Sequence, residues 1–252
     1  MEKTATLFCG TSNVVLPVPN KTHFPPEYSE KSRLCYYASL FNSVEVNSSF
    51  YKIPMQRTVE KWAADVPENF RFTFKLWRGI THEKGCVYDP ADITRFFQSI
   101  NGIGQRKGCL LVQFPGSVTS FFLPNLARLL GEISEANTTG WNVAVEFRDR
   151  SWYDDKTFEL LEQHRAAVVR HDMPKSSTPL VDTETPFVYL RFHGENGRYR
   201  GTYSGDFLRE HAEFARSMTE DGKTVYAYFN NTMGEAVHNA RDLQCFYNEM
   251  HA

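Results

Sequence analysis

Eight short β-forming runs recur along the chain, with longer segments of helical spacing between them, and this alternation constrains the fold most strongly. Most runs are almost wholly apolar until their last one or two residues, which is typical of parallel strands buried on both faces. We expect strands at Thr6–Gly10, Val44–Asn47, Arg71–Lys75, Cys109–Gln113, Asn142–Phe147, Ala166–His171, Phe187–His193 and Thr224–Phe229.

The segments between these runs predict helices. In Ser29–Phe41, for example, the apolar residues Leu34, Tyr37, Ala38 and Phe41 follow the i, i+3, i+4, i+7 spacing of one helix face. Two other segments, Thr11–Tyr28 and Asp172–Pro186, are rich in Pro or in Ser and Thr and predict loops. The remaining expected helices are Gln56–Ala64, Asp89–Ile100, Phe121–Ile133, Asp154–His164, Gly205–Thr219 and Met233–Met250.

Eight strand–helix repeats in 252 residues predict an α/β fold of the (β/α)8 TIM-barrel type, which typically takes about 250 residues. An open doubly wound sheet usually has a glycine-rich phosphate loop after its first strand. Here Gly10-Thr11-Ser12 leads into Asn13, and neither GxGxxG nor GxxxxGK[ST] occurs. Because no linker or break in composition interrupts the chain, we expect residues 1–252 to form a single domain.

Net charge and cysteine usage narrow the class of protein. Lys and Arg number 28 and Asp and Glu 30, so the formal net charge is -2. Proteins that bind nucleic acid broadly through its backbone usually carry a basic excess, so this charge disfavours that class, although a local basic patch stays possible. The five cysteines form no CxxC pair and match no zinc spacing, which fits a reducing compartment.

Localisation is expected to be cytoplasmic. Met1–Gly10 contains no apolar run long enough for a signal peptide. No stretch of the chain approaches the roughly 18 consecutive apolar residues of a membrane helix. We therefore expect no membrane partner.

Polar side chains gather where the expected strands end, which is where barrel enzymes place their active sites. Charged groups buried without partners are costly, so repeated charge at the ends of apolar strands needs a reason. The alternatives are a salt-bridge network that plugs the top of the barrel and a ligand site. The residues concerned are Glu45, Asn47, Lys75, Thr81, His82, Gln113, Glu146, Arg148, His171, Asp172, Arg191, His193, Asn230 and Asn231.

Among these, Glu45 and Glu146 are the best carboxylates for proton transfer, and His193 is the third catalytic candidate. The alternative role for each Glu is an ion pair with a neighbouring cation, and for His193 an ordinary hydrogen bond. Cations at these strand ends suit a clamp for a carboxylate or phosphate, in which Arg makes bidentate contacts. The three cations are Lys75, Arg148 and Arg191.

Other chemistries find less support. A divalent metal site built from His82, Glu146, Asp172 and His193 is conceivable, but no HExxH or similar spacing indicates it. The cofactor is therefore undetermined. Glycosidases need two carboxylates flanking the scissile bond, whereas Glu45 and Glu146 come from roughly opposite strands of the expected barrel. No Gly-x-Ser-x-Gly elbow occurs, which disfavours covalent acyl transfer.

Several long motifs resemble the YecE-like family, the domain-of-unknown-function family seventy-two. They are LFCGTS, YYASLFNSVEVNSSFYKIP, FRFTFKLWRGITH, LLVQFPGS, VAVEFRDRSW, VYLRFHG and AYFNNTMGEAVHNA, and they run from about Leu7 to Ala240. The resemblance implies a TIM barrel but carries no established activity. A similarity of architecture to the endonuclease IV and xylose isomerase group suggests nucleic-acid processing, by analogy of fold alone.

The resemblance also implies site residues and shows one departure. Asn13 and Val14 stand where family members often have Gly-Trp, so a pocket on that side is expected to differ. The residues that match the family's motifs are Glu45, Asn47, Tyr51, Lys75, Thr81, His82, Gln113, Glu146, Arg148, Trp152, Arg191, His193, Gly194, Asn230 and Asn231.

Three functions are compatible with these observations. The first is an enzyme, a hydrolase or isomerase without a defined reaction, that acts on a polar anionic small molecule or phosphoester. For it we expect Asn47, Tyr51, Lys75, His82, Gln113, Arg148, Arg191, Asn230 and Asn231 to contact the substrate. The second is a nucleic-acid-binding or processing barrel, whose binding would weaken with salt. The third is a non-catalytic protein that binds a metabolite.

Overall fold

The computed structural model describes residues 5–181 and 184–250. These residues form an α/β fold in which the strands pair in parallel within two sheets. The first sheet has the order β1-β9-β8-β7, with β1 at Leu7–Thr11, β7 at Arg170–His171, β8 at Phe187–Phe192 and β9 at Thr224–Phe229. The second has the order β2-β3-β4-β5-β6, namely Ser43–Val46, Arg71–Lys75, Lys107–Gln113, Asn142–Glu146 and Ala166–Val168.

The eight predicted strand runs are all found, and one of them divides between the sheets. The run 166–171 splits at Val169, whose backbone N–H donates to Val145 O at 2.8 Å and so still follows β5. Arg170 and His171 instead pair with Leu190 and Arg191 of β8. The chain therefore passes from the second sheet to the first at Val169.

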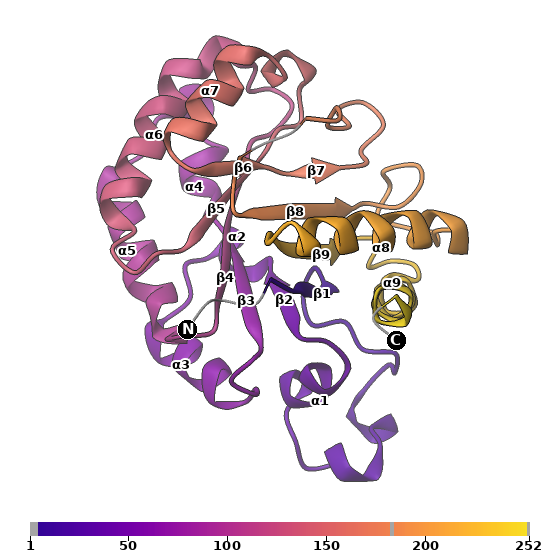
Figure 1. Ribbon diagram of the computed structural model, residues 1–252. Helices are drawn as coiled ribbons and strands as arrows, with labels where there is room; N and C mark the ends of the chain where they lie inside the picture. The colour runs from indigo at the N-terminus through magenta and orange to yellow at the C-terminus, as the bar shows by residue number, and fades with distance from the viewer. Residues whose placement is uncertain (1–4, 182–183, 251–252) are drawn as a thin grey trace.

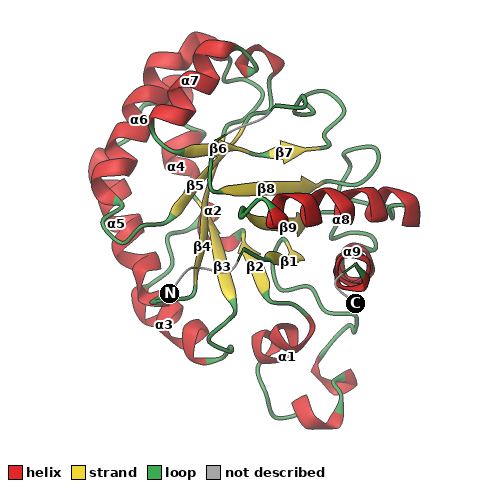
Figure 2. Cartoon of the chain, viewed as in Figure 1, coloured by secondary structure: helices red, strands yellow, loops and turns green. Residues whose placement is uncertain are grey.

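The helices lie outside the strands (Figure 1, Figure 2). In Figure 1, α5, α6 and α7 form an arc along one side of the strands, and α8 lies on the other. The long helices are α1 (Arg33–Leu40), α3 (Gln56–Ala64), α5 (Pro90–Ile100), α6 (Leu123–Ala136), α7 (Asp155–Gln163), α8 (Gly205–Glu220) and α9 (Ala236–Glu249). Seven helices were expected at these places: Gln56–Ala64 has the expected ends, and the ends of the others differ from the expected ones by a few residues.

Short helical turns inside the connections were not predicted. α2 (Ser48–Tyr51) follows β2 and α4 (Arg78–Thr81) follows β3. The expected loop after the first strand contains two 3-10 turns, at Lys21–His23 and Pro26–Tyr28. The described part of 172–186 contains no helix, as expected for a loop. The remaining 3-10 turns are Lys84–Cys86, Asn101–Ile103, Ser120–Phe122 and Arg150–Trp152.

Alternate residues of each strand pack on different sides. In β4, Leu110 and Val112 belong to the large cluster shared with the helices, whereas Cys109 and Leu111 belong to a second buried cluster. That second cluster contains residues of both sheets, including Ala144, Phe187, Tyr189, Tyr226 and Tyr228. Because side chains alternate along a strand, both sheets turn one face to the helices and the other toward a common interior.

Side chains join the two sheets where β1 runs beside β2. The Asn42 amide accepts from Cys9 N and donates to Leu7 O, both at 2.8 Å, as a neighbouring strand would. The Tyr37 hydroxyl accepts from Thr11 N at 2.7 Å and donates to Ser43 O at 3.1 Å. After the end of β1, the backbone N–H of Asn13 donates to Glu45 O at 2.7 Å. We call these contacts of Tyr37 and Asn42 the β1–β2 seam.

Gly10 lies within the β1–β2 seam, and its replacement by Ala is expected to destabilise the fold. A Cβ at this position would lie 2.0 Å from Ser43 O and 2.6 Å from the Tyr37 hydroxyl. Since one obstacle is backbone, relief requires the strands to separate, and we expect Gly10→Ala to lower the free energy of unfolding by about 1–3 kcal/mol. Urea denaturation measures this change.

The matched control is Gly131, inside α6, where an added Cβ has nothing within 4 Å. Gly131→Ala should raise the free energy of unfolding by about 0.5–1 kcal/mol, because Ala loses less backbone entropy in a helix than Gly. If Gly10→Ala stabilised the protein as much as Gly131→Ala, the β1–β2 seam would tolerate a wider spacing between the strands.

No helix in the described ranges is long and apolar enough to span a membrane.

Candidate functional site

A buried ion-pair network joins the ends of three strands. Arg191 of β8 lies between Glu45 of β2 and Glu146 of β5, and at most 1% of any of these three residues is exposed. Arg191 Nη2 donates to Glu45 Oε1 at 2.7 Å, and Nη1 donates to Glu146 Oε2 at 2.9 Å. Burial alone would lower the pKa of Arg191, but the two carboxylates hold it well above its usual value. The guanidinium is therefore a permanent charge that connects both acids.

Glu45 accepts hydrogen bonds on both carboxylate oxygens. Ser12 Oγ donates to Oε1 at 2.6 Å, and the Tyr189 hydroxyl donates to Oε2 at 2.5 Å. Burial would raise the pKa of Glu45, but Arg191 and these donors lower it below its ordinary value. Glu45 is thus an ionised group whose lone pairs are occupied by protein donors.

Glu146 is held in the same way by two guanidinium groups. Arg148, two residues later, donates from Nε to Glu146 Oε1, and Arg191 donates to Oε2. Burial opposes ionisation of Glu146, but Arg148 and Arg191 hold its pKa well below the usual range. Arg148 itself is only partly buried, with 11% of its side chain exposed. Its Nη1 donates no hydrogen bond within the part of the chain that the structure describes.

His193 is a neutral imidazole with an assigned tautomer. Arg148 Nη2 lies 2.8 Å and Arg191 Nη1 3.1 Å from His193 Nε2, and because guanidinium groups only donate, Nε2 accepts from both. The proton is then on Nδ1, which faces Asp172 Oδ1 at 3.2 Å. Burial lowers the pKa of His193 to about 4, even though Asp172 favours the charged ring.

Both carboxylate oxygens of Asp172 accept hydrogen bonds. Its Oδ1 also accepts from the backbone N–H of His193 at 2.8 Å, and its Oδ2 accepts from the Tyr203 hydroxyl. Asp172 therefore orients His193 and fixes its tautomer, much as a carboxylate orients an imidazole in a catalytic triad.

Lys75, at the end of β3, differs from the other charged groups. Only 9% of the residue is exposed, and its Nζ lies 4.0 Å from the centre of the Phe50 ring. Within the described ranges Nζ has no hydrogen-bond or ion-pair partner. Burial, followed by repulsion from Arg191, lowers the pKa of Lys75 to about 7. Its amine is consequently close to half protonated at neutral pH.

The other expected site residues surround this network in different ways. His82 packs edge-on against Phe50, and burial together with Lys75 lowers its pKa to about 4. Gln113 donates from Nε2 to Phe114 O at 3.1 Å. Asn47 has a buried Oδ1 without a hydrogen-bond partner, and Asn230 is half-buried after β9.

Two expected site residues lie less favourably for contact with a substrate. Asn231 is completely buried and donates from Nδ2 to Gly201 O and Asn239 Oδ1, both at 3.0 Å, so it holds the loop before α8 to α9. Tyr51 is 68% exposed at the end of α2 and stacks edge-on with Phe50.

Three residues of the network were missed in the sequence. Tyr189 is two residues before Arg191 on β8 and so shares its face, a signal that alternation alone could have supplied. Ser12 directly follows β1, beside Glu45 in the isolated bridge between the strands. Tyr203 lies in the loop before α8, and no local pattern in the sequence indicates its contact with Asp172.

The hypothetical metal ligands are not arranged as a metal site in the part of the chain that the structure describes. Among the described residues, no three His, Cys, Asp or Glu side chains are placed to hold one metal ion. Glu146 binds two guanidinium groups, and His193 turns Nε2 to the same two groups and Nδ1 to Asp172. In this arrangement the lone pairs that a cation would need are directed at protein donors.

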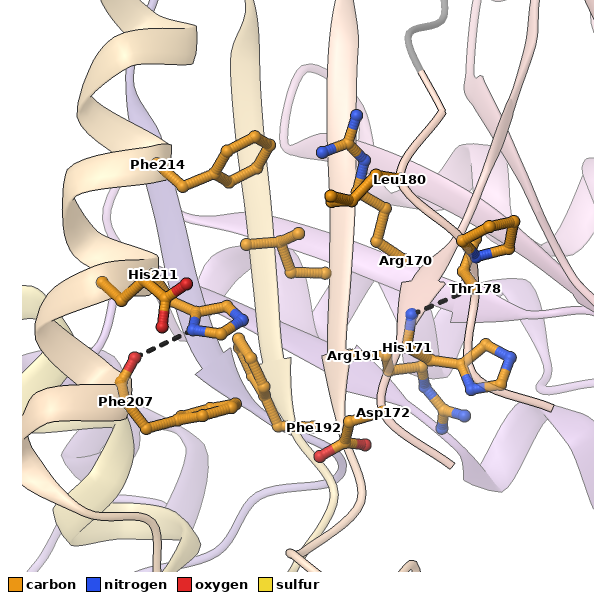
Figure 3. Close-up of a pocket in the computed structure, with 13 residues that line it drawn as sticks. Arg170, His171, Asp172, Thr178, Leu180, Arg191, Phe192, Phe207, His211 and Phe214 are labelled. Atoms are coloured by element: carbon orange, nitrogen blue, oxygen red, sulfur yellow. Dashed lines mark hydrogen bonds between the residues drawn. The ribbon is translucent and has the colours of Figure 1, made fainter. Parts of the chain in front are cut away.

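A cleft of about 240 Å³ lies between α8 and β8, and His171, Asp172 and Arg191 are among its lining residues (Figure 3). Phe207, His211 and Phe214 of α8 face it, opposite Phe192, and Leu180 of the long loop borders it. This cleft opens where no helix follows β7 in the described residues, so the sheet is covered less completely there. Its lining is mainly apolar, and Asp172 and Arg191 connect it to the charged network.

Comparison with known proteins gives a consistent family. Residues 9–251 match the family described as "Protein of unknown function DUF72". The UPF0759 protein YunF of Bacillus subtilis (strain 168) is 26% identical over 261 residues, covering 87% of this chain and 88% of that protein. The UPF0759 protein YecE of Escherichia coli (strain K12) is 27% identical over 117 residues, covering 46% of this chain and 42% of YecE.

Two solved structures have a similar fold. A DUF72 family protein (TM1631) from Thermotoga maritima MSB8 has a TM-score of 0.76 and 29% identity, covering 97% of this chain and 98% of that one. A DUF72 family protein (EF0366) from Enterococcus faecalis V583 has a TM-score of 0.77 and 23% identity, covering 98% of this chain and 99% of the other. The similarity therefore extends over nearly the whole fold.

Proposed function

This chain belongs to the DUF72 family, and we propose that it is an enzyme that acts on a polar, anionic small molecule or phosphoester. The observation that carries the proposal is a pair of cations at the strand ends, each of which keeps at least one donor nitrogen without a partner among the described residues. Arg148 has a free Nη1, and Lys75 has neither a hydrogen bond nor an ion pair within the described residues. Buried cations normally have partners, so these two groups are suited to an anion that is brought by the substrate.

The charges around the site support an anionic substrate. Glu45 and Glu146 are buried, and their oxygens are occupied by Arg191, Arg148 and neutral donors. Near the solvent-facing side, His82 lies within the electrostatic influence of Lys75, Arg78 and Arg148. The charges that act on His82 are therefore all positive.

In this proposal the buried acids position the cations. Glu45 and Glu146 are ionised and inaccessible, so they hold Arg191 and Arg148 rather than exchange protons with the substrate. His193 supports Arg148 and Arg191 through Nε2, so in this proposal it positions the two guanidinium groups. His82, Asn47, Gln113 and Asn230 complete the proposed lining.

The proposal places this site at the mouth of one closed (β/α)8 barrel formed by both sheets. Tyr228 of β9 supports this view, since its hydroxyl lies 2.6 Å from Ser43 Oγ and 2.8 Å from Thr73 Oγ1 in the other sheet. The β1–β2 seam and the passage at Val169 join the sheets along their two remaining sides. The strand ends would then surround a single basin, as in other barrel enzymes.

Arg148→Met tests the anion site with inorganic phosphate as the probe. A charge-assisted hydrogen bond contributes about 1.5–3 kcal/mol, so we expect phosphate affinity to fall about 10–100-fold. Titration calorimetry at constant ionic strength measures the change. Arg150→Met is the matched control, because Arg150 is exposed in the same loop and, among the described residues, its Nη2 donates only to Pro174 O, at 3.3 Å.

Equal affinity in wild type and Arg148→Met would contradict the assigned anion site. A loss of binding in Arg150→Met alone would move the site to the outer loop. An enzyme and a metabolite-binding protein then differ in turnover: incubation with a panel of sugar phosphates and small carboxylic acids should yield altered products, detectable by mass spectrometry, whereas recovery of every compound unchanged would favour a binding protein.

A further inference from the structure

Lys75 is buried close to two carboxylates but is paired with neither. The acids that influence it are Glu45 of β2 and Glu146 of β5, and the cations are Arg191 of β8 and Arg148. Both acids make their short contacts with the two guanidinium groups instead. His82 is the remaining titratable neighbour identified on this side, and its ring is neutral at neutral pH.

Hydrogen bonds hold the residues around Lys75 in place. Ser49 Oγ donates to Lys75 O at 2.7 Å and lies 2.7 Å from Val46 O, which ties the short helix α2 to the ends of β2 and β3. This tie fixes Phe50, whose ring lies under Nζ. The last paired residues of β2 and β3 are Val46 and Phe74. Asn47 is the next residue after Val46, as Lys75 is after Phe74, and the Oδ1 of Asn47 is buried without a hydrogen-bond partner.

An unpaired, buried lysine weakens a fold, because the charged form loses its hydration. Enzymes use the same situation to obtain a neutral amine, since a lysine in a partly apolar site next to another cation loses its proton readily and becomes a nucleophile toward carbonyl groups. Lys75 has both features: only 9% of it is exposed, and the guanidinium groups of Arg148 and Arg191 lie nearby. The face of the Phe50 ring favours the ammonium form and offsets only part of their effect on the pKa of Lys75.

We propose that Lys75 is a catalytic nucleophile that forms an imine with the carbonyl carbon of a small oxo acid or aldehyde phosphate. This inference rests on the proposed function, since the carboxylate or phosphate of that substrate would bind Arg148. It narrows the substrate to anions that contain a reactive carbonyl group.

The chemistry balances without a cofactor. The Nζ lone pair attacks the carbonyl carbon, and a C–N bond forms while the C=O π electrons move to oxygen and give a carbinolamine. Loss of water follows: both amine hydrogens leave with the former carbonyl oxygen, and a C=N bond remains. Protonation of this imine by solvent gives an iminium ion that withdraws electrons from the neighbouring carbon.

Reductive trapping of the intact protein tests the nucleophile. The probes are glyoxylate, which is an anionic aldehyde, and acetaldehyde, a neutral aldehyde of similar size, each with cyanoborohydride at about pH 7. Peptide mapping by mass spectrometry locates the reduced adduct. An ordinary lysine is almost fully protonated at this pH, so we expect Lys75 to react more than about tenfold faster than exposed Lys52 in the same sample.

Variants separate the two parts of the inference. Lys75→Met should abolish the fast adduct with both aldehydes, whereas Lys52→Arg should leave it unchanged. Arg148→Met should reduce the preference for glyoxylate over acetaldehyde about tenfold or more while Lys75 still reacts with acetaldehyde. The rate at Lys75 should level off as pH rises above about 7.

The failures are distinguishable. If Lys75 is labelled no faster than Lys52 by either aldehyde, the nucleophile is wrong whatever binds Arg148. If acetaldehyde labels Lys75 rapidly and glyoxylate shows no preference that depends on Arg148, the nucleophile stands and the anionic substrate of the proposed function is wrong.

Discussion

Arg191→Met should lower the free energy of unfolding by about 3–5 kcal/mol, the usual result of breaking a buried ion pair by removal of one partner. Arg191 is 1% exposed and contacts Glu45 and Glu146, which are both completely buried. Without the guanidinium, each carboxylate keeps only part of its partners and has to stay charged in a dry site or take up a proton. Urea denaturation at neutral pH measures the loss.

A surface variant and a double variant test whether the loss of stability comes from the buried charges. Arg209→Met is the matched surface control, since Arg209 and Glu249 are about half exposed and 3.9 Å apart, and such a pair contributes at most about 1 kcal/mol. Adding Glu45→Gln to Arg191→Met should restore part of the stability, because the stranded charge is removed. If Arg191→Met cost no more than Arg209→Met, water would have to reach both acids and the network would not be dry.

Lys75→Met should change how stability depends on pH. Lys75 has a pKa of about 7 in the fold against an ordinary value of 10.5. Between these values the unfolded chain holds a proton that the folded chain has released, so raising the pH favours folding of the wild type. This gain amounts to at most about 1.4 kcal/mol per pH unit, and it is absent in Lys75→Met.

The stability difference between wild type and Lys75→Met should depend on pH. Near neutral pH the variant should be the more stable protein, and its advantage should shrink as pH rises, because the wild type recovers the cost of its buried ammonium. Buried thiols such as Cys9 and Cys109 have raised pKa values and act in the opposite direction at alkaline pH, but they are common to both proteins and cancel in the difference.

Lys52→Met provides the control for this experiment, because Lys52 is exposed and should leave the pH dependence of the wild type unchanged. A constant difference between wild type and Lys75→Met from pH 7 upward would mean that the Lys75 amine is fully hydrated or carries a partner in solution. The same result would remove the physical basis for a neutral nucleophile.

The alternation of strands and helices could be read from the sequence because period and hydrophobicity are local properties. Arg71–Lys75 and Thr224–Phe229 were predicted to the residue. The division at Val169 could not be predicted, since residues 166–171 look like one apolar run and only the neighbours of each half assign it to a sheet. Closure into a barrel depends on the same long-range pairing.

The candidate site shows the same limit. Glu45, Glu146, Arg191 and His193 could be predicted to meet, because each ends a parallel strand. Which cation each acid selects depends on side-chain geometry, and so the sequence left open both an ion-pair plug and a ligand site. The structure contains features of each: Arg191 is fully engaged by acids, whereas Lys75, with the same formal charge, is engaged by none in the described ranges.

The β1–β2 seam has a consequence for the motions of the protein. Most neighbouring strands are held by ladders of backbone hydrogen bonds, but between β1 and β2 the described residues form only the bridge of Ser12 with Glu45, and the Tyr37 hydroxyl and the Asn42 amide make the other contacts. Release of this boundary requires rotation of these two side chains and loss of the backbone hydrogen bond from Asn13 N to Glu45 O, whereas parting two strands joined by a full ladder requires several backbone hydrogen bonds to break. The seam is therefore the natural place for a local opening in the native state, and Glu45, immediately beyond it, would be the first member of the buried network to meet water.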